Sequence, residues 1–336
     1  MENLLVKMKK KNNIFVFIVL IIALLLPVFT KSNYVISILC NCLAMASMGV
    51  AWNLIGGYGA QVSWCHAAFI SIGAYTSFIF DDNFGISPLI SMFIGAAIAY
   101  ILATIIGLTS FRLRGPFFSI STIAFAEIVR ILLLYFKGIT KGAKGYALRY
   151  TGNNPLMLMF SSDKPYYYIL LVLLSLMLII SYLYSKSKSG YYLNAIKGDE
   201  DAAVSLGIDS MKVKIGAFQL SAALTAIIGT VYGYFITFLD PDSVAGLDMS
   251  VNIGISAIIG GLGTLWGPVI GAVVLILLTE ISNVIFGSLG GGTDLMYGLV
   301  MIIMVIYRPK GLISFFSSFK TRKRSKKIKI HTHIDD

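Results

Sequence analysis

Two charged side chains inside an apolar stretch are the residues best placed to act chemically in this sequence. Glu127 and Arg130 stand three positions apart in the run 117–135, so both lie on one face of a helix, where they can pair. Charged groups at membrane depth are costly and usually face a partner or a wet cavity, so this pair could contact a substrate. The alternative is a structural ion pair near the cytoplasmic end, helped by Arg112 or Arg114.

Two glycine clusters of the form GG-x-G end apolar runs, one in each half of the chain, at 56–59 and 260–263. Gly-interrupted segments in corresponding halves are a sequence pointer to a transport pathway. The alternative is close helix packing, which Gly267 and Gly271 at GxxxG spacing also suggest. The residues that we take as pathway candidates are Gly57, Gly59, Gln61, Ser63, His66, Glu127, Gly260, Gly261 and Gly263.

Catalytic and metal-binding patterns are missing from the sequence. His66 has no second ligand near it, which favours a packed or hydrogen-bonded imidazole, and the three cysteines lie in apolar runs where a free thiol behaves as a small hydrophobe. There is no HExxH pair and no nucleophile elbow, and the run nearest to a P-loop, 138–144, has the wrong spacing. We therefore expect no catalytic residue, cofactor or metal in this chain. If ATP drives it, ATP and Mg bind to partner chains.

A polar segment, 185–214, interrupts the apolar sequence, and nine of its thirty residues are charged against 13% of the whole chain. Within it the sequence predicts a short helix over 198–208. The helix would have an acidic first turn, where the helix dipole favours negative charge, a glycine at its end, and a small apolar face. The acidic turn consists of Asp199, Glu200 and Asp201, and the terminal glycine is Gly207. The apolar face consists of Ala202, Ala203 and Leu206.

Composition defines the class of protein that must position these residues. The chain has 336 residues, of which 57% are hydrophobic, and several segments approach the roughly 20 apolar residues that cross a bilayer as a helix. The sequence thus predicts an all-α polytopic membrane protein with about ten transmembrane or half-membrane helices. The predicted spans are 14–29, 34–55, 64–80, 86–108, 117–135, 166–184, 215–238, 249–262, 268–286 and 295–306. Of these, 64–80, 249–262 and 295–306 are short or flanked by glycine and could be half-helices.

Basic residues predict the orientation, because they favour the cytoplasmic side. They cluster in 7–11 and 320–329, so both termini are predicted to be cytoplasmic, together with 112–114 and the polar segment. The acidic loop 240–248 then falls outside, and so does 137–164, although its five basic residues go against the rule. The net charge of +11 fits this placement beside anionic lipid, so we expect no nucleic-acid partner.

Motifs along nearly the whole chain resemble the membrane-spanning permease of branched-chain amino acid ABC importers, the LivM-type subunit. They occur in the family's order, at 56–63, 66–69, 73–75, 112–118, 124–130, 195–196, 199–203, 206–208, 260–268 and 308–312. Trp64 and Cys65 depart from the pattern, since such permeases more often have a small or aliphatic residue followed by glycine there.

The resemblance implies a mechanism and a set of partners. Such permeases pair with a homologous LivH-type subunit, dock onto two cytoplasmic ABC ATPases and receive substrate from an extracytoplasmic amino-acid-binding protein. It implies a bacterial inner membrane, a basic cytoplasmic N-terminus over 1–13, a permease domain over 14–312 and a basic cytoplasmic tail over 313–336. The helix at 198–208 is the candidate coupling helix to the ATPases, and the acidic loop 240–248 a candidate contact for the binding protein.

Other classes of transporter stay open at this point. An ion-coupled secondary transporter would use Glu127 or Glu280 for proton coupling, and a channel-like facilitator would need a continuous polar pore. The substrates implied by the resemblance are leucine, isoleucine or valine, while relatives carry other amino acids, amides or urea. We also expect that a bulky or charged replacement of Ala202, Ala203 or Leu206 lowers transport and ATPase stimulation, with Ala203→Arg as the test.

Overall fold

The computed structural model describes residues 21–30, 32–113, 115–150 and 152–286, with 298, 299, 302, 306 and 311–313 beyond them. Several sequence predictions lie outside the described residues, in whole or in large part. They are the basic N-terminus, the first half of the span 14–29, Arg114, most of the span 295–306, the motif positions 308–310 and the tail beyond 313.

Helices form almost all of the described structure. A helical stretch over 21–29 comes first. The long helices that follow are α2 (Asn33–Gly56), α3 (His66–Phe84), α4 (Pro88–Ser110), α5 (Pro116–Tyr135), α7 (Lys164–Lys186), α10 (Ser210–Ile236), α12 (Leu247–Gly260) and α13 (Gly267–Phe286). The short ones are α6 (Lys137–Thr140), η1 (Gly142–Lys144), η2 (Pro155–Met157), α8 (Lys188–Gly198), α9 (Glu200–Ser205) and α11 (Pro241–Ala245), and two strands, β1 (Tyr146–Ala147) and β2 (Phe238–Leu239), complete the set.

Seven segments among the described residues are long and apolar enough to cross a membrane, which agrees with a polytopic helical membrane protein. They are α2, α4, α5, α7, α10, α13 and the stretch Pro241–Gly260. In that stretch the helix breaks at Gly246, which leaves α12 only 14 residues long. The total of about ten spans and the side on which each terminus lies stay predictions.

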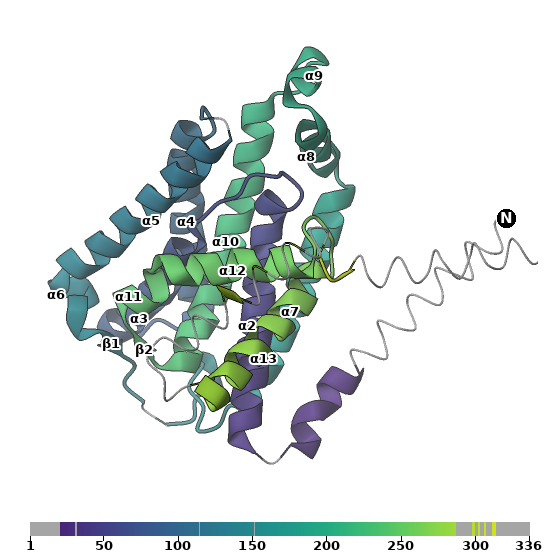
Figure 1. Ribbon diagram of the computed structural model, residues 1–336. Helices are drawn as coiled ribbons and strands as arrows, with labels where there is room; N and C mark the ends of the chain where they lie inside the picture. Colours follow the sequence, from purple (N-terminus) through teal and green to yellow (C-terminus); the bar gives the residue numbers. More distant parts are fainter. Residues whose placement is uncertain are drawn as a thin grey trace, which may run out of the picture.

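The core forms around α2 and α10, which pack against each other and against α3, α4 and α7 in an obliquely crossed bundle (Figure 1). Its largest buried side chains include Trp52 of α2, Tyr75 of α3, Phe218 and Tyr234 of α10. By contrast α5 lies at the edge, with large apolar side chains such as Phe117, Ile120 and Ile131 exposed. An apolar face left bare in one chain is covered by lipid or by another subunit.

Two loops far apart in the sequence meet at one end of the bundle. β1 pairs antiparallel with β2, with Tyr146 opposite Leu239. The Tyr146 hydroxyl of β1 donates to Asp82 (2.8 Å) and the Tyr234 hydroxyl, near the end of α10, donates to Asp81 (2.8 Å), so both are tied to the end of α3. α8 and α9 lie at the opposite end (Figure 1). The grouping matches the predicted one, in which the loops 137–164 and 240–248 share a side and the polar segment lies on the other.

Candidate functional site

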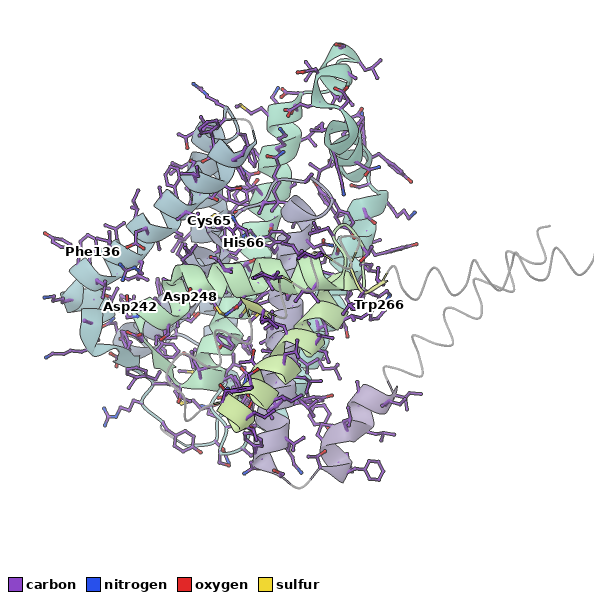
Figure 2. All side chains as sticks on the ribbon, viewed as in Figure 1. Cys65, His66, Phe136, Asp242, Asp248 and Trp266 are labelled. Atoms are coloured by element: carbon purple, nitrogen blue, oxygen red, sulfur yellow. The ribbon has the colours of Figure 1, made fainter. Side chains whose placement is uncertain are left out.

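The two glycine clusters, one from each half of the chain, lie against each other. α2 ends at Gly56 and the backbone stays non-helical until α3 begins at His66; we call 57–65 the irregular segment. α12 ends at Gly260, and 261–266 are likewise non-helical before α13. Figure 2 shows His66 near the middle of the molecule and Trp266 near the end of α12 that lies away from Asp242.

Asn53, in the last turn of α2, joins the two clusters. Its Oδ1 accepts from the amide of Gly263 (2.9 Å) and its Nδ2 donates to the carbonyl of Thr264 (3.0 Å). The contact needs glycine on both sides. A Cβ at Gly57 would lie 1.8 Å from Asn53 Oδ1, and Gly263 has a φ of +71°, a backbone conformation that side chains disfavour. We call the contact between Asn53, Gly57 and Gly263 the glycine junction.

Side chains of neighbouring helices satisfy the backbone of the irregular segment. Trp52 Nε1 donates to the Ser63 carbonyl (2.7 Å), Ser119 Oγ donates to the Val62 carbonyl (2.7 Å), and Thr122 Oγ1 accepts from the Trp64 amide (3.0 Å). Non-helical backbone at membrane depth is tolerated only where it is buried in protein or lines a cavity. Ser63 is fully buried and Gln61 half-buried, so these two pathway candidates lie on a fixed, non-helical stretch.

His66 is fully buried in an aromatic surround. Its Nε2 lies 2.8 Å from Ser221 Oγ, and the Ser221 hydroxyl donates its one hydrogen to the carbonyl of Ala51 (2.6 Å). His66 must therefore donate from Nε2, which leaves Nδ1 as an acceptor without a partner. The rings of Trp52, Phe69 and Phe218 surround it edge-on. This is the packed, hydrogen-bonded histidine of the sequence interpretation, and among the described residues no cluster of metal-ligating side chains includes it.

The second glycine cluster lies at a close helix contact, which the close-packing alternative expects, and its role in a pathway stays a prediction. A Cβ at Gly260 would lie 1.6 Å from the carbonyl oxygen of Gly267, and one at Gly271 would lie 1.7 Å from that of Ser256. The GxxxG pair at 267 and 271 thus lets α13 approach α12 closely. Gly261 also faces Gly311, where the Leu312 amide donates to the Ile259 carbonyl (2.8 Å).

Glu127 and Arg130 form an ion pair, as their spacing predicts. The further charged residue that joins them is Asp242, which the sequence interpretation did not name. Arg130 Nε donates to Glu127 (3.0 Å), and its guanidinium also pairs with Asp242 of α11. The sequence interpretation looked to Arg112 or Arg114 near the cytoplasmic end. Arg130 instead lies in the last two turns of α5, where it meets the acidic loop 240–248 through Asp242. We call Glu127, Arg130 and Asp242 the charged triad.

The polar segment folds into two short helices rather than one. α8 occupies Lys188–Gly198, and α9 occupies only Glu200–Ser205, shorter than the predicted 198–208. Asp199 caps α9 by accepting from the Ala202 amide (3.0 Å), and Gly207, at a φ of +85°, follows its end as predicted. Asp209 caps α10, and its hydrogen bond to Lys212 lowers the pKa of its carboxyl below the usual value.

The predicted apolar face of α9 is divided between the inside and the outside. Ala203 is buried against the rest of the chain, whereas Ala202 is exposed and Leu206 is 84% exposed. The acidic turn is also divided, since Glu200 turns back to accept from Lys214 Nζ (2.6 Å). α9 is therefore anchored to α10 on one side and presents Leu206 to its surroundings on the other.

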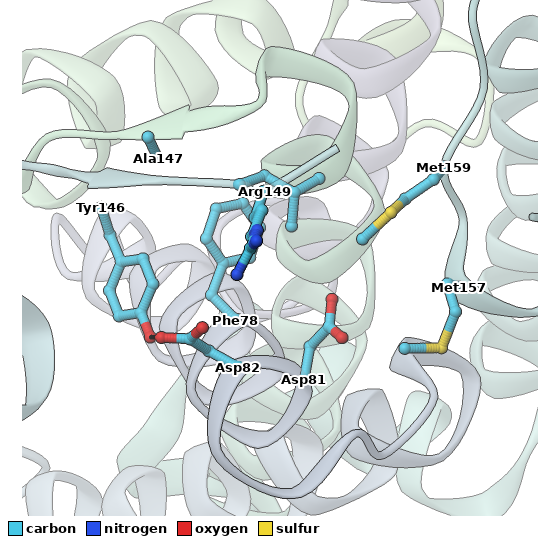
Figure 3. A pocket seen from close by; sticks show the side chains of 9 residues that line it. Phe78, Asp81, Asp82, Tyr146, Ala147, Arg149, Met157 and Met159 are labelled. Atoms are coloured by element: carbon cyan, nitrogen blue, oxygen red, sulfur yellow. Dashed lines mark hydrogen bonds between the residues drawn. The ribbon is translucent and has the colours of Figure 1, made fainter. Parts of the chain in front are cut away.

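A cavity of about 250 Å³ lies at the opposite end of the molecule, between the end of α3 and the loop after α6 (Figure 3). Figure 3 shows Asp81, Asp82 and Arg149 turned into it, with Met157 and Met159 on another wall. Its two carboxylates are held by Tyr234 and Tyr146. Charges of both signs at a surface cavity favour polar contacts with a partner or solute.

The fold and site define a multi-pass helical membrane protein. Non-helical backbone is buried inside its helix bundle and a short helix is exposed at one end, an arrangement that fits the membrane subunit of a transporter. The family model "Branched-chain amino acid transport system / permease component" matches residues 34–306, and the chain belongs to this family.

Individual relatives give the type of permease. The chain is 28% identical over 328 residues to the Escherichia coli "High-affinity branched-chain amino acid transport system permease protein LivM", covering 90% of this chain and 75% of that protein. It is 21% identical to the LivH permease of Salmonella typhimurium, covering 80% and 90%. It is thus a LivM-type permease that also resembles the LivH type. Among solved structures, PsaBC from Streptococcus pneumoniae in complex with Fab aligns at 14% identity, with 84% and 94% coverage and a TM-score of 0.47.

Three residues that carry these contacts were missed by the sequence interpretation. Asn53 is one of two amide side chains in the apolar run 34–55, and an amide in such a run marks a side chain that needs partners. Lys214 lies in the polar segment and Asp242 in the acidic loop 240–248. Their partners, Glu200 and Arg130, are 14 and 112 residues away along the chain, and sequence spacing does not reveal such pairs.

Proposed function

We propose that this chain is the membrane-spanning subunit of an ATP-driven importer for branched-chain or related amino acids in the bacterial inner membrane. A LivH-type permease, two cytoplasmic ATPases that bind ATP and Mg, and an extracytoplasmic binding protein complete the transporter. The observation that carries the proposal is α9, a capped helix anchored to α10 by Glu200 and Lys214 that leaves Leu206 exposed. An exposed apolar side chain at the end of an anchored helix suits a groove on a partner.

The test identifies the energy source of transport and the proteins that assemble with this chain. We expect the chain to co-purify with the two ATPases and the second permease, and leucine uptake into proteoliposomes to require ATP and the binding protein. Uptake driven by an ion gradient with this chain alone would support the secondary-transporter alternative and reject the proposal. Mass spectrometry of the ligand held by the cognate binding protein then identifies the amino acid.

The charged triad supports the position of the pathway. Glu127 is 47% exposed within a membrane span, and charge is costly against lipid. We therefore infer that this face of α5 borders a water-filled path beside the second permease. The irregular segment and the glycine junction form its inner wall, and the charged cavity of Figure 3 belongs to the end that meets the binding protein.

Cysteine labelling separates a wet face from a lipid face. In a background without the native cysteines, we expect Glu127→Cys in the assembled transporter to react with a membrane-impermeant thiol reagent. Ile128→Cys, at 51% exposure on the next position of the same helix, is the matched control and should stay unlabelled. Equal labelling at both positions, or none at either, would argue against a water-filled path at this face.

A further inference from the structure

The polar segment touches the glycine junction directly, through one side chain. Lys197, in the last turn of α8, donates from Nζ to the carbonyl of Gly57 (2.8 Å). Gly57 is the C-cap residue that follows the last residue of α2, so its carbonyl has no partner within the helix. A cation is favoured at this place, because the C-terminal end of a helix carries partial negative charge.

Gly263, the second glycine of the junction, leaves room for this ammonium group. A Cβ at Gly263 would lie 3.2 Å from Lys197 Nζ and 3.0 Å from the Gly57 carbonyl oxygen. One charged group therefore sits where the end of α2 meets the loop after α12. The Asn53 side chain joins α2 to the same loop, through the Gly263 amide and the Thr264 carbonyl.

A second contact of α8 lies one turn earlier. Leu193 is fully buried and packs closely against Gly59. A Cβ at Gly59 would lie 3.2 Å from Leu193 Cδ1. α8 thus contacts the irregular segment at two residues: Leu193 packs against Gly59, and Lys197 donates a hydrogen bond to Gly57. This segment runs on to Ser63 and to His66 at the start of α3.

The other end of the same unit is the exposed helix. Lys197 precedes the Asp199 cap of α9 by two residues, and Glu200 binds Lys214 of α10 (2.6 Å). A displacement of α9 therefore carries α8 with it, and Lys197 is the polar connection from α8 to the backbone of the membrane core.

We propose that Lys197 is the positioning residue that links the α8–α9 unit to the glycine junction, so that movement of the cytoplasmic helices shifts the irregular segment and the loop after α12 together. This inference rests on the proposed function, since it assumes that ATPases move α9. Lys197 binds no substrate and no nucleotide in this account. It acts by holding the Gly57 carbonyl.

The test uses the full transporter with its ATPases, second permease and binding protein, and leucine as the probe. In Lys197→Met we expect normal assembly but an about tenfold loss of ATP-hydrolysis stimulation by leucine-loaded binding protein, the effect of losing a hydrogen bond from a charged donor. Lys197→Arg keeps a cationic donor and should recover most of the stimulation. Lys188→Met is the matched control, because Lys188 lies on the same helix and contacts only the Tyr192 ring among the contacts described for it.

Hydrogen–deuterium exchange of the same assemblies without nucleotide tests the contact apart from ATP. Exchange in 57–61 and 261–264 should rise in Lys197→Met and stay unchanged in Lys188→Met. Unchanged exchange in Lys197→Met would overturn the contact. Raised exchange with wild-type stimulation and uptake would overturn the linking role. If the wild-type transporter takes up leucine without ATP, the proposed function fails while the exchange result still decides the contact.

Discussion

Leu206→Asp is expected to abolish most ATP-driven uptake by weakening the attachment of the ATPases. Leu206 is 84% exposed at the end of α9, so the substitution leaves the chain's own core untouched. A charge placed where an apolar anchor enters a partner's groove costs about 2 kcal/mol, a roughly 30-fold loss of affinity. The measurement is the amount of ATPase retained on the purified permease pair, followed by uptake in proteoliposomes.

The matched control is Leu156→Asp, because Leu156 is a similarly exposed leucine (67%) in the loop at the opposite end. It should retain the ATPases as the wild type does. Full retention and uptake in Leu206→Asp would refute α9 as the coupling helix. The structure also makes this a better test than Ala203→Arg, since Ala203 is buried within the chain and arginine there would disturb α9 itself.

Glu200→Ala is expected to destabilise the cytoplasmic end of the chain. The Lys214 side chain is only 5% exposed and both carboxylate oxygens of Glu200 accept from its Nζ (2.6 and 2.7 Å), so the variant leaves a buried ammonium without its counter-charge. Breaking a buried pair from one side costs about 3–5 kcal/mol, and the 35% exposure of Glu200 reduces this to about 2 kcal/mol. A lowered thermal midpoint of the purified protein and loss of uptake are the readouts.

The double variant Glu200→Ala/Lys214→Met should recover much of the stability, because no buried charge is then left unpaired. Lys212→Ala is the matched control. It removes the exposed pair between Lys212 and Asp209 in the same segment and should leave the thermal midpoint nearly unchanged, because solvent screens such a pair. A double variant as unstable as Glu200→Ala alone would show that the unpaired ammonium of Lys214 is not the cause of the lost stability.

The sequence predicted the irregular places of the fold well, because they are marked by residue types. Glycine clusters at 56–59 and 260–263 ended α2 and α12, and Gly207 follows the end of α9 as predicted, whereas Asp199 caps this helix instead of lying in its first turn. These residues act locally, through backbone freedom or through a hydrogen bond to an amide a few residues away. Local effects of this kind can be recognised from the sequence alone.

The direction of each side chain was predicted less well. The i, i+3, i+4 spacing put Ala202, Ala203 and Leu206 on one face, yet Ala203 is buried and Leu206 points away from the chain. In a helix of six residues, the packing of α8 and α10 decides which side is covered. The ion pair of Glu127 with Arg130 was predictable from its spacing, but Asp242 joined it only because α11 packs beside α5.

By itself the sequence determined that this is a multi-pass helical membrane protein of the branched-chain amino acid permease family, since apolar length and motif order are properties of the chain. Only the tertiary structure brought together Asn53, Lys197, Gly57 and Gly263, which lie as far as 210 residues apart. The physical reason is that buried backbone groups must find hydrogen-bond partners wherever folding places them, and the partners come from helices that are neighbours in space and not in sequence.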